Sequence, residues 1–211
     1  MRQLSELGAS VRLEHVFELI TRLKQICNVD PTSGRSAKLD DLEQRLATLT
    51  AEGHRALVFS QFADARFGAR AIGARLARFR PLVYTGELSP RQRDEVLDQF
   101  RTNPEHRLLV LSLRAGGQGL NLQEASYVFH LDRWWNPAVE RQAEDRSHRL
   151  GQTKPVHVYS YICEETIEER IDAILRAKER LFADLVDEVS LDPRTALSGS
   201  ELLGLFDLAR G

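Results

Sequence analysis

Residues 107–152, RLLVLSLRAGGQGLNLQEASYVFHLDRWWNPAVERQAEDRSHRLGQ, decide the fold of this chain. Two short runs within them, 108–111 and 127–131, are apolar and rich in branched and aromatic side chains. Strands that are buried on both faces of a parallel sheet have this composition. Each run ends in polar, turn-forming sequence. In an open parallel sheet, ligands bind beyond the carboxyl ends of the strands, so we expect the chemistry of this chain along that edge.

The loop after the first run contains Gly116, Gly117 and Gly119. Glycine permits positive φ and lets backbone N–H groups approach a ligand closely, as phosphate-binding turns require. A tight turn that binds nothing explains the same three glycines. The loop by itself therefore leaves both interpretations open.

The second run leads into an expected helix over 137–150 that an Asn-Pro pair begins. Gln142, Arg146 and Arg149 are spaced at i, i+4 and i+7, which places them on one helical face. Two permanently charged guanidiniums on a rigid face suit a phosphate whose charge grows during transfer. Interspersed acidic residues leave a solvated face of ion pairs as the alternative.

Three strings in this stretch resemble a known family. QAEDRSHRLGQ is similar to the last motif of superfamily-two helicases, in the form used by the Swi/Snf family of DNA-translocating ATPases. LSLRAGGQGLNL and DRWWNP resemble the preceding motif of that family and its tryptophan block. The resemblance implies an α/β fold, a three-layer RecA-like lobe. A mostly parallel central sheet would be flanked by helices, and an amino-terminal helical segment would precede it.

The resemblance also implies roles for individual residues. Arg146 and Arg149 would be arginine fingers, which makes them the expected catalytic residues. The expected nucleotide-binding residues are Gln142, Gly117, Gly119 and Asn121. The expected DNA-binding residues are Ser60, Gln61, Thr85, Gly86, Ser112, Arg114, Gly116 and Trp135. Arg114 stands where the family commonly has lysine, and either side chain is a cation.

Two of these DNA-binding pairs lie outside the central stretch. Ser60 and Gln61 end the apolar run 56–59, in a string that is similar to the first motif of the family's second lobe. Without the resemblance they are turn residues. Thr85 and Gly86 end another expected strand, where a hydroxyl and an N–H can contact a phosphate oxygen. Taken as a bare dipeptide, they form only a turn.

Helical patterns surround the expected strands. Apolar residues on helical spacing predict helices over 5–27 and 38–51. A helix over 63–79 is expected to connect the first two strands and to give a right-handed parallel crossover. We divide the chain into a helical linker at 1–36, the lobe at 37–190 and a short tail helix at 191–211.

Composition restricts how this chain can bind nucleic acid. A formal charge of -2 excludes binding through bulk positive charge, so any DNA contact must be local. Arginines nevertheless crowd one region, where they could follow a phosphate backbone or form a solvated helix face. They are Arg66, Arg70, Arg75, Arg78, Arg80, Arg91 and Arg93.

Cys27 and Cys163 are far apart in the sequence and have no neighbouring ligand clusters, so we expect no metal site and a reducing compartment. No apolar run has the length of a membrane span, so a membrane is not an expected partner. The expected location is cytoplasmic and nucleoid-associated in a bacterium, or nuclear in a eukaryote.

The sequence has neither a GxxxxGK[ST] loop nor a DExx pair after an apolar strand, and ATP hydrolysis needs both. We therefore expect the second motor lobe of an ATP-dependent double-stranded DNA translocase, inactive by itself. An absent first lobe would hold the Mg²⁺ that accompanies ATP. The expected partners are double-stranded DNA, that lobe, and RNA polymerase or another DNA-bound protein.

Three other functions fit the sequence less well. A non-catalytic module derived from a helicase lobe could bind nucleic acid or protein, and Arg146 would then be dispensable. An RNA helicase lobe is disfavoured by WWNP and by Asp145, where those enzymes usually have glycine. A dinucleotide-binding enzyme is disfavoured because GGQG lacks the GxGxxG spacing.

Overall fold

Five parallel strands form one sheet in the order β2-β3-β1-β4-β5. The computed structural model of the chain describes residues 2–116, 120, 122–134, 155–182 and 198–206. The strands are β1 (Ala56–Ser60), β2 (Leu82–Tyr84), β3 (Leu108–Ser112), β4 (Tyr127–His130) and β5 (His157–Ser160). The parallel sheet predicted from the apolar runs is confirmed.

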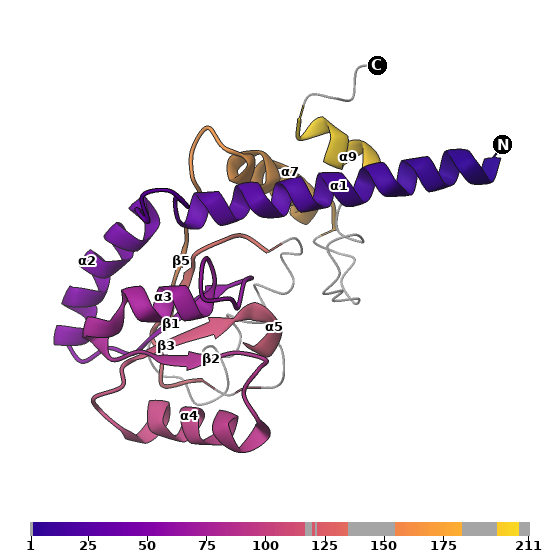
Figure 1. The fold of residues 1–211 in the computed structure, drawn as a ribbon. Coiled ribbons are helices and arrows are strands. Elements are labelled where there is room, and N and C mark those ends of the chain that lie inside the picture. Colours follow the sequence, from indigo (N-terminus) through magenta and orange to yellow (C-terminus); the bar gives the residue numbers. More distant parts are fainter. Residues whose placement is uncertain (1, 117–119, 121, 135–154, 183–197, 207–211) are drawn as a thin grey trace.

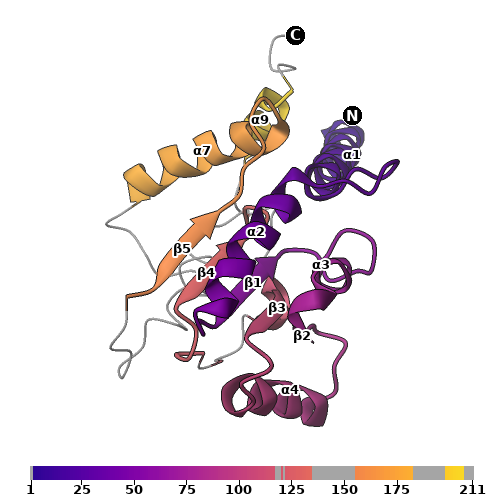
Figure 2. The ribbon, with the colours of Figure 1, turned by 90° about the vertical axis from the view of Figure 1, so that its left-hand side faces the viewer.

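Helices cover both faces of this sheet, which gives three layers (Figures 1 and 2). On β1, Leu57 and Phe59 point to the face covered by α4 (Pro90–Thr102). Ala56 and Val58 point to the face covered by α2 (Ala37–Ala51) and α3 (Ala69–Arg75). Successive side chains of a strand alternate between faces, so a strand covered on both sides must be apolar throughout.

Local capping sets where the covering helices begin. Ser36 is the N-cap of α2 and its side chain accepts a hydrogen bond from the Leu39 N–H. Ser89 and Gln92 form a reciprocal capping box at the start of α4, with Pro90 in the first turn. Such caps satisfy N–H groups that have no partner within the helix.

A separate apolar cluster lies beyond the three layers. It joins α1 (Arg2–Asn28), α7 (Ile167–Phe182) and α9 (Gly199–Gly204) through Ile20, Ile171 and Leu202. Figure 1 shows α7 and α9 alongside the long helix α1. The expected linker and tail segments therefore pack against each other and against α7. None of the helices in the described residues is both long and apolar enough to cross a membrane.

The single helix predicted over 63–79 is wrong. The structure has a loop, then α3, and then the short 3-10 helix η1 (Ala77–Phe79). Asp64 delays the start of α3, because its Oδ1 accepts hydrogen bonds from the N–H groups of Arg66 and Phe67, both at 2.8 Å. Side-chain bonds of this kind compete with helical backbone bonds.

Gly68 holds this loop closed, and its replacement by alanine is expected to lower the free energy of unfolding by about 2 kcal/mol or more. An added Cβ would lie 2.5 Å from the carbonyl carbon of Phe62 and 2.6 Å from the nitrogens of Ala63 and Asp64. Urea denaturation followed by circular dichroism measures the change. Gly86→Ala is the control, because no atom lies within 4 Å of its added Cβ. Equal stability of the two variants would contradict the prediction.

Candidate nucleic-acid interface

The carboxyl ends of three neighbouring strands bring together three hydroxyl-bearing residues. Ser60 ends β1 and is the register partner of Ser112, which ends β3. Thr85 follows Tyr84, whose register partner on β3 is Leu111, so Thr85 continues the same row on β2. Neighbouring strands are about 4.8 Å apart. These predicted DNA-binding residues therefore form a row at the edge where parallel sheets bind ligands.

The three hydroxyls differ in what they contact, although Ser60, Thr85 and Ser112 are all buried, with exposed fractions of 0%, 3% and 2%. The Ser60 hydroxyl donates to Asp132 Oδ2 at 2.7 Å and accepts from the Phe62 N–H at 3.2 Å. The hydroxyls of Thr85 and Ser112 have no hydrogen-bond partner among the described residues. Ser60 thus stabilises its own loop, and its contact with DNA stays a prediction.

Asp132, just beyond β4, organises this edge, and the sequence interpretation gave it no role. Its side chain is completely buried. Besides the Ser60 hydroxyl, the carboxylate accepts the Gln61 backbone N–H at 2.7 Å and the Asn28 side-chain amide at 2.7 Å. Several donors are needed to compensate a carboxylate that has left water. An acidic residue soon after a buried strand was the only signal that could have found it.

Lys24 of α1 also contacts the loop that follows β1. Its completely buried side chain donates from Nζ to Gln61 Oε1 at 3.1 Å and to the carbonyl of Arg133. An ammonium group only donates, so this contact fixes which end of the Gln61 amide faces Lys24. Gln61 Nε2 has no hydrogen-bond partner among the described residues. This Nε2 is buried, so Gln61 serves here to hold the loop against α1.

A buried ion pair connects this network to α2 and α7. Lys38 Nζ lies 2.7 Å from the carboxylate of Glu168, and the two side chains are 4% and 0% exposed. Lys38 also donates to Asn28 Oδ1 at 3.2 Å and to the Leu131 carbonyl at 2.8 Å. Glu168 accepts the Cys163 backbone N–H at 3.0 Å. The loop that follows β1 is thus supported by side chains from α1, α2 and α7.

The Thr85-Gly86 turn is held from α4. The Arg93 guanidinium donates to the Gly86 carbonyl at 2.8 Å, and the Leu88 N–H donates to the Thr85 carbonyl at 3.3 Å. Gly86 is exposed, and a Cβ placed there would meet no atom within 4 Å. The turn therefore leaves room for a ligand beside its backbone.

The other predicted site residues lie further along the chain. Arg114 and Gly116 belong to α5 (Leu113–Gly116), directly after β3. Trp134 of the tryptophan block is 3% exposed and packs in the core with Phe59.

The helix expected over 137–150 lies outside the described residues. The predicted site residues that also lie outside them are Gly117, Gly119, Asn121, Trp135, Gln142, Arg146 and Arg149.

Most arginines of the arginine-rich region between Arg66 and Arg93 form ion pairs. The pairs are Arg70 with Glu87, Arg75 with Asp40 and Glu43, Arg78 with Glu43, Arg80 with Glu105, and Arg91 with Glu95. A guanidinium that is paired with a carboxylate attracts a phosphate less strongly. The structure therefore favours the solvated-face interpretation of these arginines.

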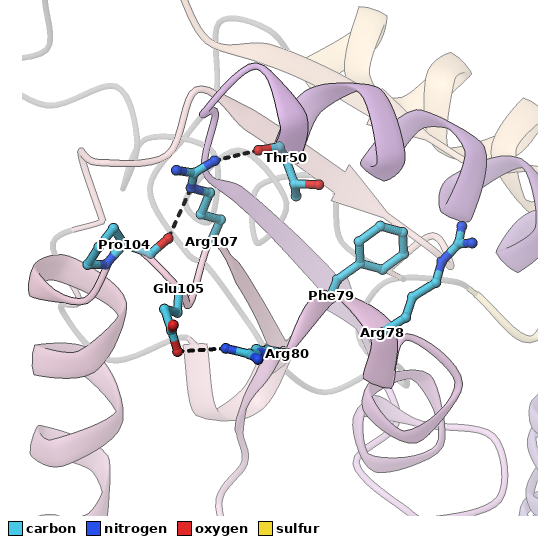
Figure 3. Close-up of a pocket in the computed structure, with 7 residues that line it drawn as sticks. All are labelled: Thr50, Arg78, Phe79, Arg80, Pro104, Glu105 and Arg107. Atoms are coloured by element: carbon cyan, nitrogen blue, oxygen red, sulfur yellow. Dashed lines mark hydrogen bonds and ion pairs between the residues drawn. The ribbon is translucent and has the colours of Figure 1, made fainter.

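A pocket of about 220 Å³ lies at the opposite, amino-terminal edge of the sheet (Figure 3). It is lined by Thr50, Arg78, Phe79, Arg80, Pro104, Glu105 and Arg107. Arg80 pairs with Glu105 at 2.6 Å, and Arg107 donates to the carbonyls of Thr50 and Pro104. These guanidiniums already have partners, so the pocket is a weaker candidate than the carboxyl edge.

Comparison with known proteins identifies the family of this chain. Residues 37–151 match the helicase conserved C-terminal domain. The chain is similar to the Bacillus subtilis protein YwqA, which carries the name of an ATP-dependent helicase/translocase. The identity is 37% over 211 residues, covering 92% of this chain and 22% of YwqA. The chain thus spans about a fifth of the length of this relative.

Two solved structures from Sulfolobus solfataricus have the same fold. The SWI2/SNF2 ATPase C-terminal domain has a TM-score of 0.61 and 28% identity, over 95% of this chain and 91% of that one. The SWI2/SNF2 ATPase core in complex with dsDNA has a TM-score of 0.66 and 31% identity, over 94% of this chain and 46% of that one. Because the family match spans more than half of the chain and the fold agrees, the chain belongs to the helicase conserved C-terminal domain family, as a RecA-like carboxy-terminal lobe of the Swi/Snf type.

Proposed function

We propose that this chain is the second motor lobe of an ATP-dependent double-stranded DNA translocase, and that its carboxyl edge holds one strand of the duplex. The observation that carries the proposal is the row formed by Ser60, Ser112 and Thr85, with exposed Gly86 beside it. Hydroxyls and backbone N–H groups bind phosphate oxygens without reading the base sequence. A translocase needs that kind of contact because it must move over any sequence.

The proposed contacts divide into those that bind and those that position. Thr85 and Ser112 bind phosphates through hydroxyls that other described residues leave unused. Gln61 belongs to the proposed set by resemblance to the family, and Arg114 adds a positive charge. Ser60 acts through Asp132 to fix the loop that carries Gln61. Trp135 and Gly116 complete the DNA-binding set by resemblance to the family.

ATP, the substrate of the proposed motor, belongs in a cleft between this lobe and an amino-terminal one. Arg146 and Arg149 would supply charge to its γ-phosphate, bordered by Gln142, Gly117, Gly119 and Asn121. The Mg²⁺ would be held by the other lobe. Closing the cleft completes the site, and repeated closure and opening moves the DNA. RNA polymerase or another DNA-bound protein is the proposed target.

The isolated chain is expected to show no ATP turnover, with or without duplex DNA, because its sequence has no loop to hold the β- and γ-phosphates. A coupled assay of ADP release measures this. The control adds a catalytic amount of an unrelated DNA-stimulated ATPase, to establish that the DNA and the buffer support turnover. Sustained hydrolysis by the pure chain would contradict the two-lobe proposal.

Arg114→Ala is expected to weaken duplex binding and to lower the slope of log K against log [salt] by about one, because one phosphate contact no longer releases a counterion.

Thr85→Ala combined with Ser112→Ala is expected to weaken binding about tenfold without changing that slope, because hydroxyls carry no charge. Fluorescence anisotropy with a labelled duplex of arbitrary sequence, measured at several salt concentrations, gives both quantities.

Arg78→Ala provides the matched control for these binding experiments. It removes the same charge as Arg114→Ala, but Arg78 lies in η1, before β2, at the opposite edge of the sheet. We expect the duplex affinity and the salt slope of Arg78→Ala to equal those of the unmodified chain. If Arg78→Ala and Arg114→Ala weaken binding equally, the carboxyl edge is not the interface.

A further inference from the structure

The two cysteines of the chain meet in the structure, although they are 136 positions apart in the sequence. Cys27 lies in the last turn of α1, and Cys163 lies between β5 and α7. The two sulfur atoms and a carboxylate oxygen of Glu168 all lie within 4.8 Å of one another. The Cys163 thiol also lies 3.5 Å from the Cys27 carbonyl oxygen and donates to it. Their separation in the sequence gave no sign of this contact.

The surroundings make the two thiols chemically unequal. The neighbouring Cys163 thiol, with help from the Thr166 hydroxyl and the Lys38 ammonium, lowers the pKa of Cys27 to about 7, against the opposing effects of burial and Glu168. The proximity of Cys27, together with burial, raises the pKa of Cys163 far above its ordinary value. Cys27 is therefore the more readily ionised of the two thiols, and Cys163 keeps its proton. An attacking thiolate beside a protonated partner is the arrangement of redox-active cysteine pairs.

We propose that Cys27 and Cys163 are a peroxide-responsive modification site that closes to a disulfide between α1 and the segment after β5. The Cys27 thiolate attacks a peroxide oxygen, the O–O bond breaks, and Cys27 sulfenic acid and hydroxide form. The hydroxide takes up the proton that Cys27 released on ionising and becomes water. The Cys163 sulfur then attacks the Cys27 sulfur, an S–S bond forms, and the S–O bond breaks. The leaving hydroxyl takes the Cys163 proton and departs as water. Two thiols lose two electrons in total, and one hydrogen peroxide becomes two waters.

The geometry suits this reaction. Both cysteines are half-buried, so hydrogen peroxide can reach them while a protein reductant or oxidant has less access. A disulfide bond is about 2.05 Å long, so sulfurs that start within 4.8 Å of each other must approach by side-chain rotation and by movement of the segment after β5. Cys27 is at the end of a helix and Cys163 is in irregular backbone, which permits that movement.

A metal ion fits the same cluster less well. The Glu168 carboxylate already contacts the Lys38 ammonium at 2.7 Å and accepts the Cys163 N–H at 3.0 Å. Lys38 would therefore compete with a cation for the only carboxylate. Structural zinc sites use four protein ligands, and this cluster offers two thiols and one engaged carboxylate. The redox chemistry of the two thiols is the better supported function.

The disulfide would fasten α1 to the lobe. It would close a loop that contains all five strands of the sheet, and it would lie beside the Lys38–Glu168 pair. Cross-linking a loop of this length constrains the unfolded chain strongly, and we expect the Tm to rise by about 5–15 °C on oxidation. The proposal does not depend on the proposed motor function, since it uses only contacts within this chain.

The test treats the reduced chain with one equivalent of hydrogen peroxide, blocks the remaining thiols with N-ethylmaleimide under denaturing conditions and measures the intact mass. We expect a loss of two hydrogens, no maleimide adduct, and a tryptic peptide that joins the two cysteines. The species should be monomeric on a non-reducing gel, and dithiothreitol should restore both thiols. Intermolecular dimers, or two free thiols after this treatment, would overturn the proposal.

Single serine variants test the unequal roles. Cys163→Ser is expected to stop at the sulfenic acid, which dimedone traps, because the resolving thiol is missing. Cys27→Ser is expected to react with peroxide at least tenfold more slowly. Equal rates in the two variants would contradict the assignment of Cys27 as the attacking thiolate. If the untreated chain instead binds one equivalent of added Zn²⁺ that protects both thiols from maleimide, the cluster is a metal site and the redox proposal fails.

Discussion

Arg146→Ala, introduced into the full-length protein that the proposed function requires, is expected to lower DNA-stimulated ATP hydrolysis by about 10³-fold or more. The guanidinium is permanently charged and would stabilise the charge that develops on the γ-phosphate during transfer. Duplex affinity should stay within about twofold, because the residue is assigned to ATP and not to DNA. Steady-state hydrolysis at saturating DNA, together with anisotropy, separates the two effects.

Two further variants sharpen this experiment. Arg149→Ala should have a similar effect, since both arginines lie on one face of the helix expected over 137–150. Arg141→Ala removes the same charge from a different face of that expected helix, and it should hydrolyse ATP at nearly the normal rate. If Arg146→Ala is as active as Arg141→Ala, this lobe is a binding module without a catalytic role.

Lys38→Met is expected to lower the free energy of unfolding by about 3–5 kcal/mol, because it leaves the completely buried Glu168 carboxylate without its cation. It also removes the donor to the Leu131 carbonyl and to Asn28. Urea denaturation of the isolated chain, followed by circular dichroism, measures the loss. The loss in free energy of unfolding should be larger than the loss from breaking any exposed ion pair of the chain.

The double variant Lys38→Met with Glu168→Leu tests the electrostatic cause. Removing both charges should recover about half of the lost stability, since the uncompensated carboxylate is gone but the Cys163 N–H loses its acceptor. The control Arg80→Met breaks a pair whose side chains are 64% and 63% exposed, and it should cost less than about 1 kcal/mol. If Lys38→Met also lowers the free energy of unfolding by less than about 1 kcal/mol, the buried pair does not stabilise the fold as proposed.

The strands could be predicted because their signal is local. The runs 56–59 and 108–111 became β1 and β3 with one additional residue each, Ser60 and Ser112. A strand covered on both faces must be apolar at every position, and this is visible without knowing what covers it. The helix over 63–79 failed because Asp64 and Gly68 form a tight loop through contacts that helical periodicity does not record.

The row of hydroxyl-bearing residues at the carboxyl edge was predictable, but the contacts around it were not. The motifs placed Ser60, Thr85 and Ser112 at one edge, and the register confirms that they form a row. The network around Asp132 was not predicted, because its partner Asn28 lies 104 residues away. For the same reason the burial of the Ser60 hydroxyl could not be anticipated from the turn sequence that contains it.

The sequence by itself determined the family, the parallel sheet and the edge that carries the predicted DNA-binding residues. These depend on strand composition and on motifs whose order along the chain is sufficient to identify them. Only the tertiary structure decided that Lys38 meets Glu168, that Cys27 meets Cys163, and that α1 packs with α7 and α9. Lys38 and Glu168 are 130 positions apart, and Cys27 and Cys163 are 136 positions apart. Contacts over such separations depend on how the layers pack around the whole sheet, and no local pattern of side chains encodes them.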